Sequence, residues 1–349
     1  MFSFFKKAAP VQATINGQAI TVQPKETLLQ AALRQGIDFP HSCRVGGCAS
    51  CKCKLLDGQV KELTQSSYIL SDEDLDNRMI LACQAVPRTD VRIEVDLAAA
   101  QARRTVGGRV VAQDRLTHDI VRLRLQLDEA LPYKAGQFAE LSLDGLPGVA
   151  RSYSFATAPQ ADATVSFFVR QVPQGQFSGH VGTHNLVGQR ASVQGPLGEF
   201  WLRPGQGPLL MVAGGSGLAP ILAMLEDARA QGTQRPVTLL FGARTQADLY
   251  AQDTLAQLAR DWPAGLRFVP VLSAEPEGSG WRGERGLVGE RVAHELAAMG
   301  AAADHAQAYL CGPPPMVDAV SASLQQRGWS RERIHADRFT TLHDTAAAA

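Results

Sequence analysis

Residues 43–53 read "CRVGGCASCKC" and contain four of the six cysteines of the chain. Cys43, Cys48 and Cys51 have the spacing C-x4-C-x2-C, and Cys83 follows downstream in "LACQ". This is the plant-type spacing of a [2Fe–2S] cluster, in which four thiolates surround two bridged irons. The sequence therefore predicts a [2Fe–2S] cluster bound by these four cysteines.

Two other readings of this loop are weaker. Zinc sites usually combine two short C-x2-C units, which the x4 gap and the distant fourth cysteine fit poorly. A disulfide is less favoured still in a reducing compartment.

Gly46 and Gly47 let the loop backbone approach the sulfurs closely and present N–H groups to them. Cys53 follows Cys51 on an expected strand that leaves the loop. We expect its side chain to point away from the cluster, and we leave it out of the ligand set.

The composition sets the broad class of protein. A chain of 349 residues is long enough for two or three domains. Lys+Arg and Asp+Glu both total 34, so no net charge favours nucleic acid or an acidic membrane as a partner. No apolar run reaches the ~20 residues of a spanning helix. The N-terminal "MFSFFKKAAP" has the wrong order of residues for a secretory signal, so we expect a cytoplasmic protein.

Three segments with different patterns follow one another. Residues 1–97 predict a small β-rich domain, with a hairpin around Asn16-Gly17 and an amphipathic helix in "ETLLQAALRQG". Residues 98–105 predict a linker. Residues 106–203 contain several short strands separated by Gly and Pro turns, which favours an antiparallel barrel. Residues 204–349 alternate strands and helices, which predicts a parallel sheet covered on both faces.

Three motifs in this order resemble a known family. "HSCRVGGCASC…LAC" resembles a plant-type ferredoxin. "RSYSFA", "GGSGLAP" and "CGPPPM" resemble the flavin and nicotinamide motifs of the ferredoxin-NADP reductase superfamily. The combined order is similar to the reductase components of bacterial multicomponent oxygenases, such as those of phenol hydroxylase, toluene monooxygenase and benzoate dioxygenase. The resemblance covers roughly residues 11–344. It implies an α+β multidomain protein with a β-grasp ferredoxin domain, an FAD-binding barrel and an NAD-binding α/β domain.

The flavin motif has a chemical rationale. The guanidinium of Arg151 is permanently charged and can donate paired hydrogen bonds to the pyrophosphate of FAD. Tyr153 supplies a ring and a hydroxyl suited to the flavin and its ribityl chain. The resemblance places Ser154 at the isoalloxazine ring. We expect Ser178 to cap a helix N-terminus that binds the same pyrophosphate. Taken alone, "RSYS" would equally describe an exposed arginine beside half-buried strand residues. The residues assigned to FAD are Arg151, Ser152, Tyr153, Ser154, Arg170, Gly175, Phe177 and Ser178.

The nucleotide motifs are interpreted in the same way. The glycine turn allows close backbone approach to a phosphate, although in isolation it could be an ordinary strand–helix turn. Arg244 and Asp248 follow the second strand of this domain, where an acidic residue favours NADH and an arginine favours NADPH. The resemblance places Cys311 at the hydride-transfer site and Phe339 over the flavin ring; an isolated cysteine is more commonly just a buried thiol. The residues assigned to the nucleotide are Gly214, Gly215, Ser216, Gly217, Arg244, Asp248, Cys311, Gly312, Pro313 and Phe339, with Ser154, Cys311 and Phe339 as catalytic residues.

These observations predict a monomeric NADH-dependent reductase that passes electrons from NADH through FAD and the cluster to a terminal oxygenase. Two alternatives remain open. The acceptor could be a different protein, such as a deoxysugar dehydratase or a membrane-bound hydroxylase. The chain could also be a non-catalytic redox sensor, although both nucleotide motifs argue against that function.

Overall fold

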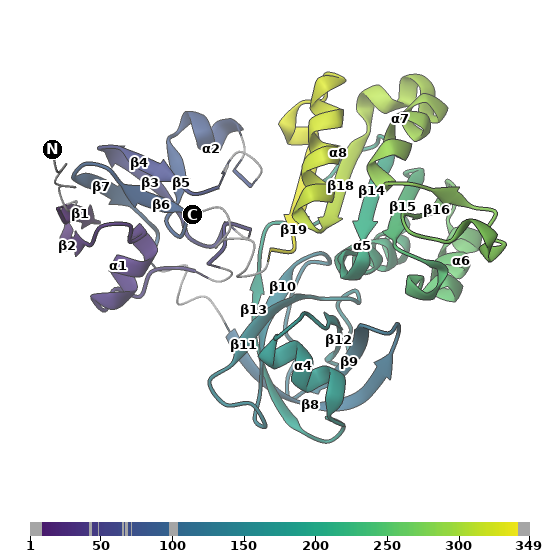
Figure 1. Ribbon diagram of the computed structural model, residues 1–349, viewed down its shortest axis with the longest axis horizontal. Helices are drawn as coiled ribbons and strands as arrows, with labels where there is room; N and C mark the ends of the chain where they lie inside the picture. The colour runs from purple at the N-terminus through teal and green to yellow at the C-terminus, as the bar shows by residue number, and fades with distance from the viewer. Residues whose placement is uncertain are drawn as a thin grey trace, which may run out of the picture. The chain divides into compact units, whose positions relative to one another are not determined.

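The computed structural model describes residues 9–41, 44–47, 49–64, 66, 69–70, 72–97 and 104–340. The predicted cluster ligands Cys43 and Cys48 lie outside the described residues, as do residues 98–103 of the predicted linker. The chain divides into two compact units, one of residues 1–103 with 340–349 and one of Arg104–Phe339. Figure 1 labels their helices and strands.

The first unit is a β-grasp domain, as predicted. Its five-stranded sheet has the order β2-β1-β7-β3-β5, in which β1 and β7 run parallel and the other neighbours antiparallel. Strands β4 and β6 form a separate ladder. The elements are β1 (Val11–Ile15), β2 (Gln18–Val22), α1 (Leu28–Arg34), β3 (Lys52–Asp57), β4 (Val60–Glu62), α2 (Asp72–Asp76), β5 (Met79–Leu81), β6 (Ala85–Pro87) and β7 (Val91–Glu94).

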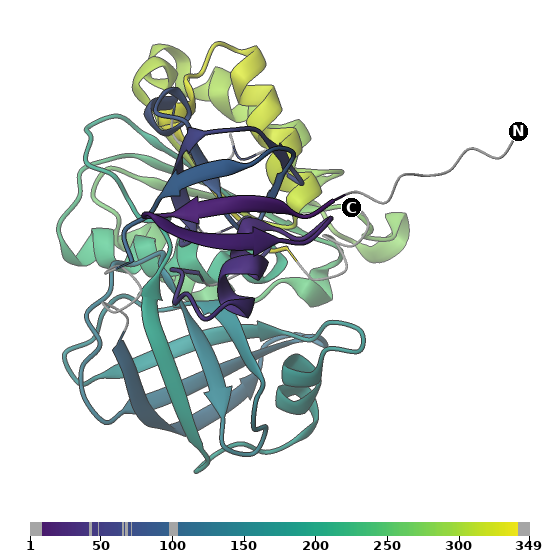
Figure 2. The same cartoon turned by 90° about the vertical axis from the view of Figure 1, so that its left-hand side faces the viewer.

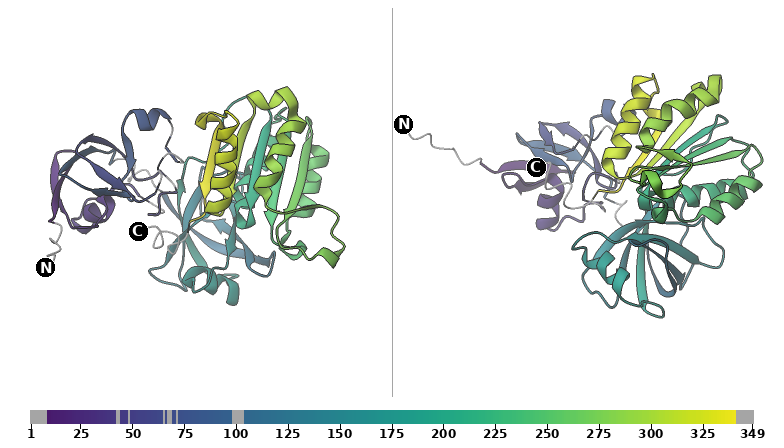
Figure 3. Two further views of the ribbon diagram at one scale, coloured as in Figure 1. Left: turned by 45° about the horizontal axis from the view of Figure 1, so that its top comes forward. Right: turned by 45° about the vertical axis from the view of Figure 1, so that its right-hand side comes forward.

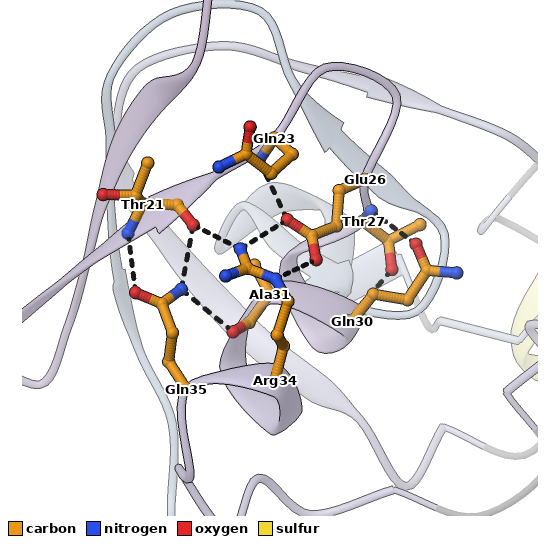
Figure 4. Close-up of polar contacts among 8 residues, drawn as sticks. All are labelled: Thr21, Gln23, Glu26, Thr27, Gln30, Ala31, Arg34 and Gln35. Atoms are coloured by element: carbon orange, nitrogen blue, oxygen red, sulfur yellow. Dashed lines mark hydrogen bonds and ion pairs between the residues drawn. The ribbon is translucent and has the colours of Figure 1, made fainter.

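Local sequence explains the start of this domain. Asn16 and Gly17 both have positive φ, 49° and 88°, as a two-residue hairpin turn requires. Figure 2 shows this hairpin in purple beside α1. Thr27 and Gln30 form a capping box, in which each side chain accepts a hydrogen bond from the other residue's backbone N–H (Figure 4). Arg34 pairs with Glu26 at 2.8 Å and ties the last turn of α1 back to the segment before it.

The second unit begins with a six-stranded antiparallel barrel. The strand order is β11-β10-β13-β8-β9-β12, and a bridge between Phe155 and Phe167 joins the two ends of that order. Buried and half-buried residues alternate along β13, as expected of a strand with one face on a core. Strand β8 begins at Arg104, so the last two residues of the predicted linker already belong to the barrel. The elements are β8 (Arg104–Arg115), β9 (Ile120–Leu127), β10 (Phe138–Leu143), β11 (Ala150–Ser154), β12 (Thr164–Arg170), α4 (Gln176–Thr183) and β13 (Arg190–Leu197).

The rest of this unit is a sheet of six parallel strands in the order β17-β16-β15-β14-β18-β19, with helices on both faces (Figures 1 and 3). The strands are β14 (Leu209–Gly214), β15 (Val237–Ala243), β16 (Leu266–Leu272), β17 (Glu284–Arg285), β18 (Gln307–Gly312) and β19 (Ile334–Arg338). The helices are α5 (Leu218–Ala230), α6 (Gln252–Asp261), α7 (Val288–Met299) and α8 (Pro314–Gln326). Short 3-10 turns are η2 (Gly215–Gly217), η3 (Gln246–Asp248), η4 (Glu277–Ser279), η5 (Gly300–His305) and η6 (Arg331–Arg333).

Every residue of β14 is buried, as expected of a central parallel strand. Leu209 and Met211 belong to the core shared with α5 and α6, and Leu210 and Val212 to the core shared with α7 and α8. The first of these cores also includes barrel residues such as Phe168, so barrel and sheet share one apolar interior. In the described part of the chain, no helix is both long and apolar enough to cross a membrane.

Candidate functional site

Two of the predicted cluster ligands lie side by side in the first unit. Cys51 is 2% exposed and Cys83 5% exposed, and the backbone N–H of Cys83 points to Cys51 Sγ at 3.4 Å. The side-chain amide of Gln84 lies 3.5 Å from Cys83 Sγ. Hydrogen bonds to sulfur are the usual surroundings of iron–sulfur thiolates. The two described sulfurs therefore fit half of a [2Fe–2S] ligand set.

The loop backbone at Gly46 lies close to the segments that carry Thr64 and Gln84. Gly46 has a φ of 80°, and a Cβ there would lie 2.8 Å from Gln84 Cγ and 2.9 Å from Thr64 Oγ1. A side chain at this position would push against the residue that follows Cys83. Gly46 is thus needed for both its conformation and its small size.

Cys53 packs in the interior of the first unit, but not for the reason given from the sequence. Side chains two residues apart on a strand face the same side, so alternation cannot separate Cys53 from Cys51. Cys51 instead lies in the turn before β3, whereas Cys53 lies on β3, is 1% exposed and pairs with Ile80 of β5. Burial, and then the neighbouring Cys83, raise the pKa of the Cys53 thiol. A neutral thiol in an apolar core is the state expected of a structural cysteine.

The predicted flavin residues lie on β11 and around α4. Arg151 and Ser152 are exposed, Tyr153 is half-buried and Ser154 is 5% exposed at the end of the strand. The Tyr153 ring lies 5.3 Å from that of Phe177 on α4. The barrel therefore brings the strand motif and the helix together, with a guanidinium, a ring and a helix start to hold a dinucleotide.

The N-terminus of α4 differs from the prediction. Gly175 is the N-cap residue, and Ser178 lies inside the first turn. The Ser178 hydroxyl accepts a hydrogen bond from the Val172 N–H at 3.2 Å and so closes the loop before the helix. A Cβ on Gly175 would meet Val172 Cγ2 at 2.5 Å, which leaves room only for glycine. Ser178 shapes this loop and does not cap the helix.

The glycine turn and the Cys311 segment pack backbone against backbone. Strands β14 and β18 are neighbours with Ala213 opposite Cys311. A Cβ on Gly217 would overlap the Cys311 carbonyl and lie 2.8 Å from the Gly312 nitrogen. A Cβ on Gly312 would lie 2.9 Å from the Gly214 carbonyl oxygen. Two motifs almost a hundred residues apart thus form one surface at the carboxyl ends of adjacent parallel strands, where nucleotides bind in such sheets.

Cys311 and Phe339, two of the residues predicted to be catalytic, lie next to this surface. Cys311 is fully buried, and burial followed by the charge of Asp337 raises the pKa of its thiol, so it stays neutral. The backbone N–H of Phe339 donates to the Gly312 carbonyl at 2.9 Å, and the Phe339 ring packs on the core that includes Cys311. Pro313 is the N-cap residue of α8 and closes the segment. Ser216 lies in η2, 8% exposed.

The two residues predicted to select the nucleotide have different surroundings. Within the described residues, Arg244 makes no side-chain hydrogen bond or ion pair that would hold it away from a ligand. Asp248 is engaged by the protein itself. Its Oδ2 accepts hydrogen bonds from the Thr245 N–H at 2.9 Å and hydroxyl at 3.0 Å, and its Oδ1 lies 3.1 Å from His118 Nδ1.

Sequence reasoning missed two groups here. Glu275 follows β16, and hydrogen bonds from the side chain and backbone of Gln246 hold the pKa of Glu275 below its ordinary value. Its carboxylate is thereby held at Gln246, two residues after Arg244. His118 and Asp119 lie on the β8–β9 turn of the barrel, and with Asp248 each brings one atom within 4.8 Å of the others. No spacing rule joins positions so far apart.

Comparison with known proteins agrees with this arrangement. Residues 13–88 match the 2Fe-2S iron-sulfur cluster binding domain, residues 108–201 the oxidoreductase FAD-binding domain and residues 211–322 the oxidoreductase NAD-binding domain. The chain therefore belongs to the oxidoreductases that combine these three domains. More narrowly, it belongs to the family of reductase components of oxygenase systems.

The relatives span nearly the whole chain. The xylene/toluene monooxygenase electron transfer component of Pseudomonas putida is 39% identical over 97% of this chain and 98% of its own. The reductase component of phenol 2-monooxygenase from Pseudomonas sp. strain CF600 is 36% identical over 95% of this chain and 94% of its own. Among solved structures, the Amycolatopsis cytochrome P450 reductase GcoB matches with a TM-score of 0.68 and 32% identity, over 95% of this chain and 99% of that one.

Proposed function

We propose that this protein oxidises NADH and delivers the electrons singly, through FAD and a [2Fe–2S] cluster, to the terminal oxygenase of an aromatic-compound mono- or dioxygenase system. The observation that carries the proposal is the joint surface of the glycine turn and the Cys311 segment on a sheet that shares its core with the barrel. This surface is the argument for a nicotinamide site next to the flavin site, and the neighbouring Cys51 and Cys83 are the argument for a cluster site.

In the proposed mechanism, residues of this chain bind the three cofactors and orient them for electron transfer. Bound FAD supplies the conversion between two-electron and one-electron transfer, which an iron–sulfur cluster lacks. Arg151 and the start of α4 would hold its pyrophosphate, and Ser154 would offer a hydrogen bond to the ring. The glycine turn would bind the nucleotide phosphates, and the neutral Cys311 and Phe339 would form an apolar surface beside the nicotinamide. Cys43, Cys48, Cys51 and Cys83 hold the cluster.

We propose four units within the chain: residues 1–97 for the cluster, a linker shortened from the predicted 98–105 to 98–103 because β8 begins at Arg104, residues 104–203 for FAD and residues 204–339 for NADH. The compact unit Arg104–Phe339 supports the grouping of the last two. We further propose a cytoplasmic monomer. Clustered metal-binding cysteines suit a reducing compartment. Light scattering on the purified protein tests the monomer, which has a mass of 37.4 kDa.

Preference for NADH is supported by the negative charge of Glu275, because a 2′-phosphate nearby would face like charge. Arg244 is then the residue that would favour NADPH. Glu275→Gln is expected to lower the NADH:NADPH ratio of kcat/KM by about tenfold, the scale of one polar contact. A wild-type preference for NADPH would overturn this assignment.

Steady-state assays separate the proposed function from its alternatives. The purified protein is expected to oxidise NADH continuously when an oxygenase component or cytochrome c accepts the electrons. A redox sensor would show a single turnover and then stop. A reductase for another acceptor would reduce cytochrome c but fail to support turnover by any aromatic oxygenase component. Genes beside this one would indicate which component to test first.

A further inference from the structure

The turn between β8 and β9 reaches from the barrel to the nucleotide-binding sheet. His118 in this turn has its Nδ1 3.1 Å from Oδ1 of Asp248, which belongs to η3 behind β15. The His118 side chain is 68% exposed, whereas that of Asp248 is only 18% exposed. The contact therefore joins a surface side chain of one domain to a half-buried carboxylate of the other.

The carboxylate of Asp248 is fixed on its own side as well. Oδ2 accepts from the Thr245 N–H and hydroxyl, which completes the capping box of η3. Two residues further on, the Tyr250 hydroxyl donates to the Gly215 carbonyl at 2.8 Å. The segment that carries Asp248 is thereby tied directly to the glycine turn. Three of the roughly four acceptor sites of the Asp248 carboxylate are thus already used within the protein.

The barrel side is equally well held. Asp119 accepts from the Thr117 hydroxyl at 2.9 Å through Oδ1 and from Arg170 Nε at 3.0 Å through Oδ2. Burial opposes ionisation of Asp119, but these hydrogen bonds outweigh it and lower its pKa. The Gln171 N–H also donates to the Asp119 carbonyl at 2.7 Å. His118 is thus presented from a turn whose neighbouring residue is anchored to the end of β12.

We propose that His118 is a positioning residue: through its contact with Asp248 it holds the glycine turn at the distance from the barrel that hydride transfer requires. In this proposal the Asp248 carboxylate makes that contact and does not bind the nucleotide ribose. The inference rests on the proposed function, since the quantity it sets is the approach of nicotinamide to flavin. Hydride transfer needs the reacting atoms about 3–3.5 Å apart, so a small displacement of the turn is felt in the rate.

The two roles of Asp248 predict different results. If it selects the ribose, Asp248→Asn changes the NADH:NADPH ratio and His118→Ala leaves both rates unchanged. If Asp248 is instead the partner of His118, both Asp248→Asn and His118→Ala slow flavin reduction. Each substitution then slows the reaction with NADH and the reaction with NADPH equally, so the NADH:NADPH ratio does not change. Loss of one exposed hydrogen-bonding contact of this kind corresponds to about a two- to fivefold lower rate. The double variant is then no slower than Asp248→Asn, because the same contact is removed twice.

The experiment measures anaerobic flavin reduction by rapid mixing with each nucleotide, on the full-length holoprotein. His118→Lys places an N–H donor within reach of Asp248 and is expected to retain the wild-type rate. His305→Ala is the matched control, since this exposed histidine precedes the amino end of β18, at the opposite end of the sheet from the glycine turn. It is expected to leave the rate unchanged.

Hydrogen exchange without nucleotide provides a second readout. His118→Ala is expected to speed amide exchange in residues 245–250 of the other domain, and His118→Lys to leave it as in the wild type. Unchanged exchange and unchanged rates in His118→Ala would overturn the proposal, as would a change in nucleotide ratio confined to the Asp248 variant. Failure of the wild type to reduce its flavin with either nucleotide would instead refute the proposed function, and exchange would still decide whether the contact exists.

Discussion

Gly217→Ala should slow the reduction of the flavin by NADH while the protein still folds and binds its cofactors. Gly217 has φ −61° and ψ −11°, which every residue adopts, so no backbone strain opposes the change. The obstacle is space. The new Cβ would overlap the Cys311 carbonyl oxygen and lie 2.5 Å from its carbon. Both atoms belong to a buried strand, so the glycine turn is the part that must move.

The size of the effect follows from this geometry. Overpacking a close contact costs about 1–3 kcal/mol, and part of this is offset by the lower entropy of alanine in the unfolded chain. We therefore expect a fall in Tm of a few degrees, with FAD and iron still bound. Displacement of the turn by about 1 Å is expected to slow flavin reduction by NADH on the order of a hundredfold.

Rapid-mixing measurements of flavin reduction, with FAD and iron contents and Tm in parallel, test this expectation. Gly278→Ala is the control, because a Cβ at Gly278 in the same domain meets nothing within 4 Å. It should behave as the wild type. If Gly217→Ala reduces its flavin at the wild-type rate, the contact between the glycine turn and the Cys311 segment does not position the nucleotide.

Three further results are expected. Cys83→Ser should lose the cluster and Cys53→Ser should keep it, as measured by iron and sulfide analysis; loss of iron in Cys53→Ser would show that the ligand set is wrong. A chain beginning near residue 100 should bind FAD and reduce ferricyanide with NADH but reduce cytochrome c poorly, and full cytochrome c activity would refute the electron order. Burial, and then Arg203 and Arg235, lower the pKa of His335 to about 4 from 6.5. The folded protein then binds fewer protons than the unfolded chain between these values, so stability present above pH 6.5 is lost as the pH falls towards 4. His335→Asn should reduce this acid-dependent fall in Tm, and an identical pH profile in the variant would contradict it.

The sequence predicted the fold well because its signals are local. The Asn16-Gly17 turn needs positive φ at both positions, and the buried run of β14 needs a central place in a sheet. Each of these constraints acts over a few residues and does not depend on distant partners. The predicted barrel and parallel sheet followed from the same kind of pattern, repeated along the chain.

The predictions that needed correction depended on detail beyond such patterns. Ser178 was expected to cap α4, but the N-cap is Gly175, three residues earlier, where the glycine fits against Val172 and Ser178. This shift is larger than the usual uncertainty of one or two residues in a helix boundary. The reason given for excluding Cys53 failed because side chains two residues apart on a strand face the same side; what distinguishes the two cysteines is that Cys51 precedes β3 whereas Cys53 lies on it.

For Asp248, the proposed role differs from the role that its position in the motif predicts. Its place behind the second strand is where a ribose-binding carboxylate is expected, and an aspartate there satisfies the sequence rule. The same side chain, however, is two residues from Tyr250 and three from Thr245, and its oxygens are used by Thr245 and His118. A carboxylate with those partners fixes the loop that must receive the nucleotide, whereas Glu275 brings charge to the neighbouring strand end. The proposal therefore assigns nucleotide selection and support of the binding loop to different carboxylates, and the contacts of each carboxylate are the basis for that assignment.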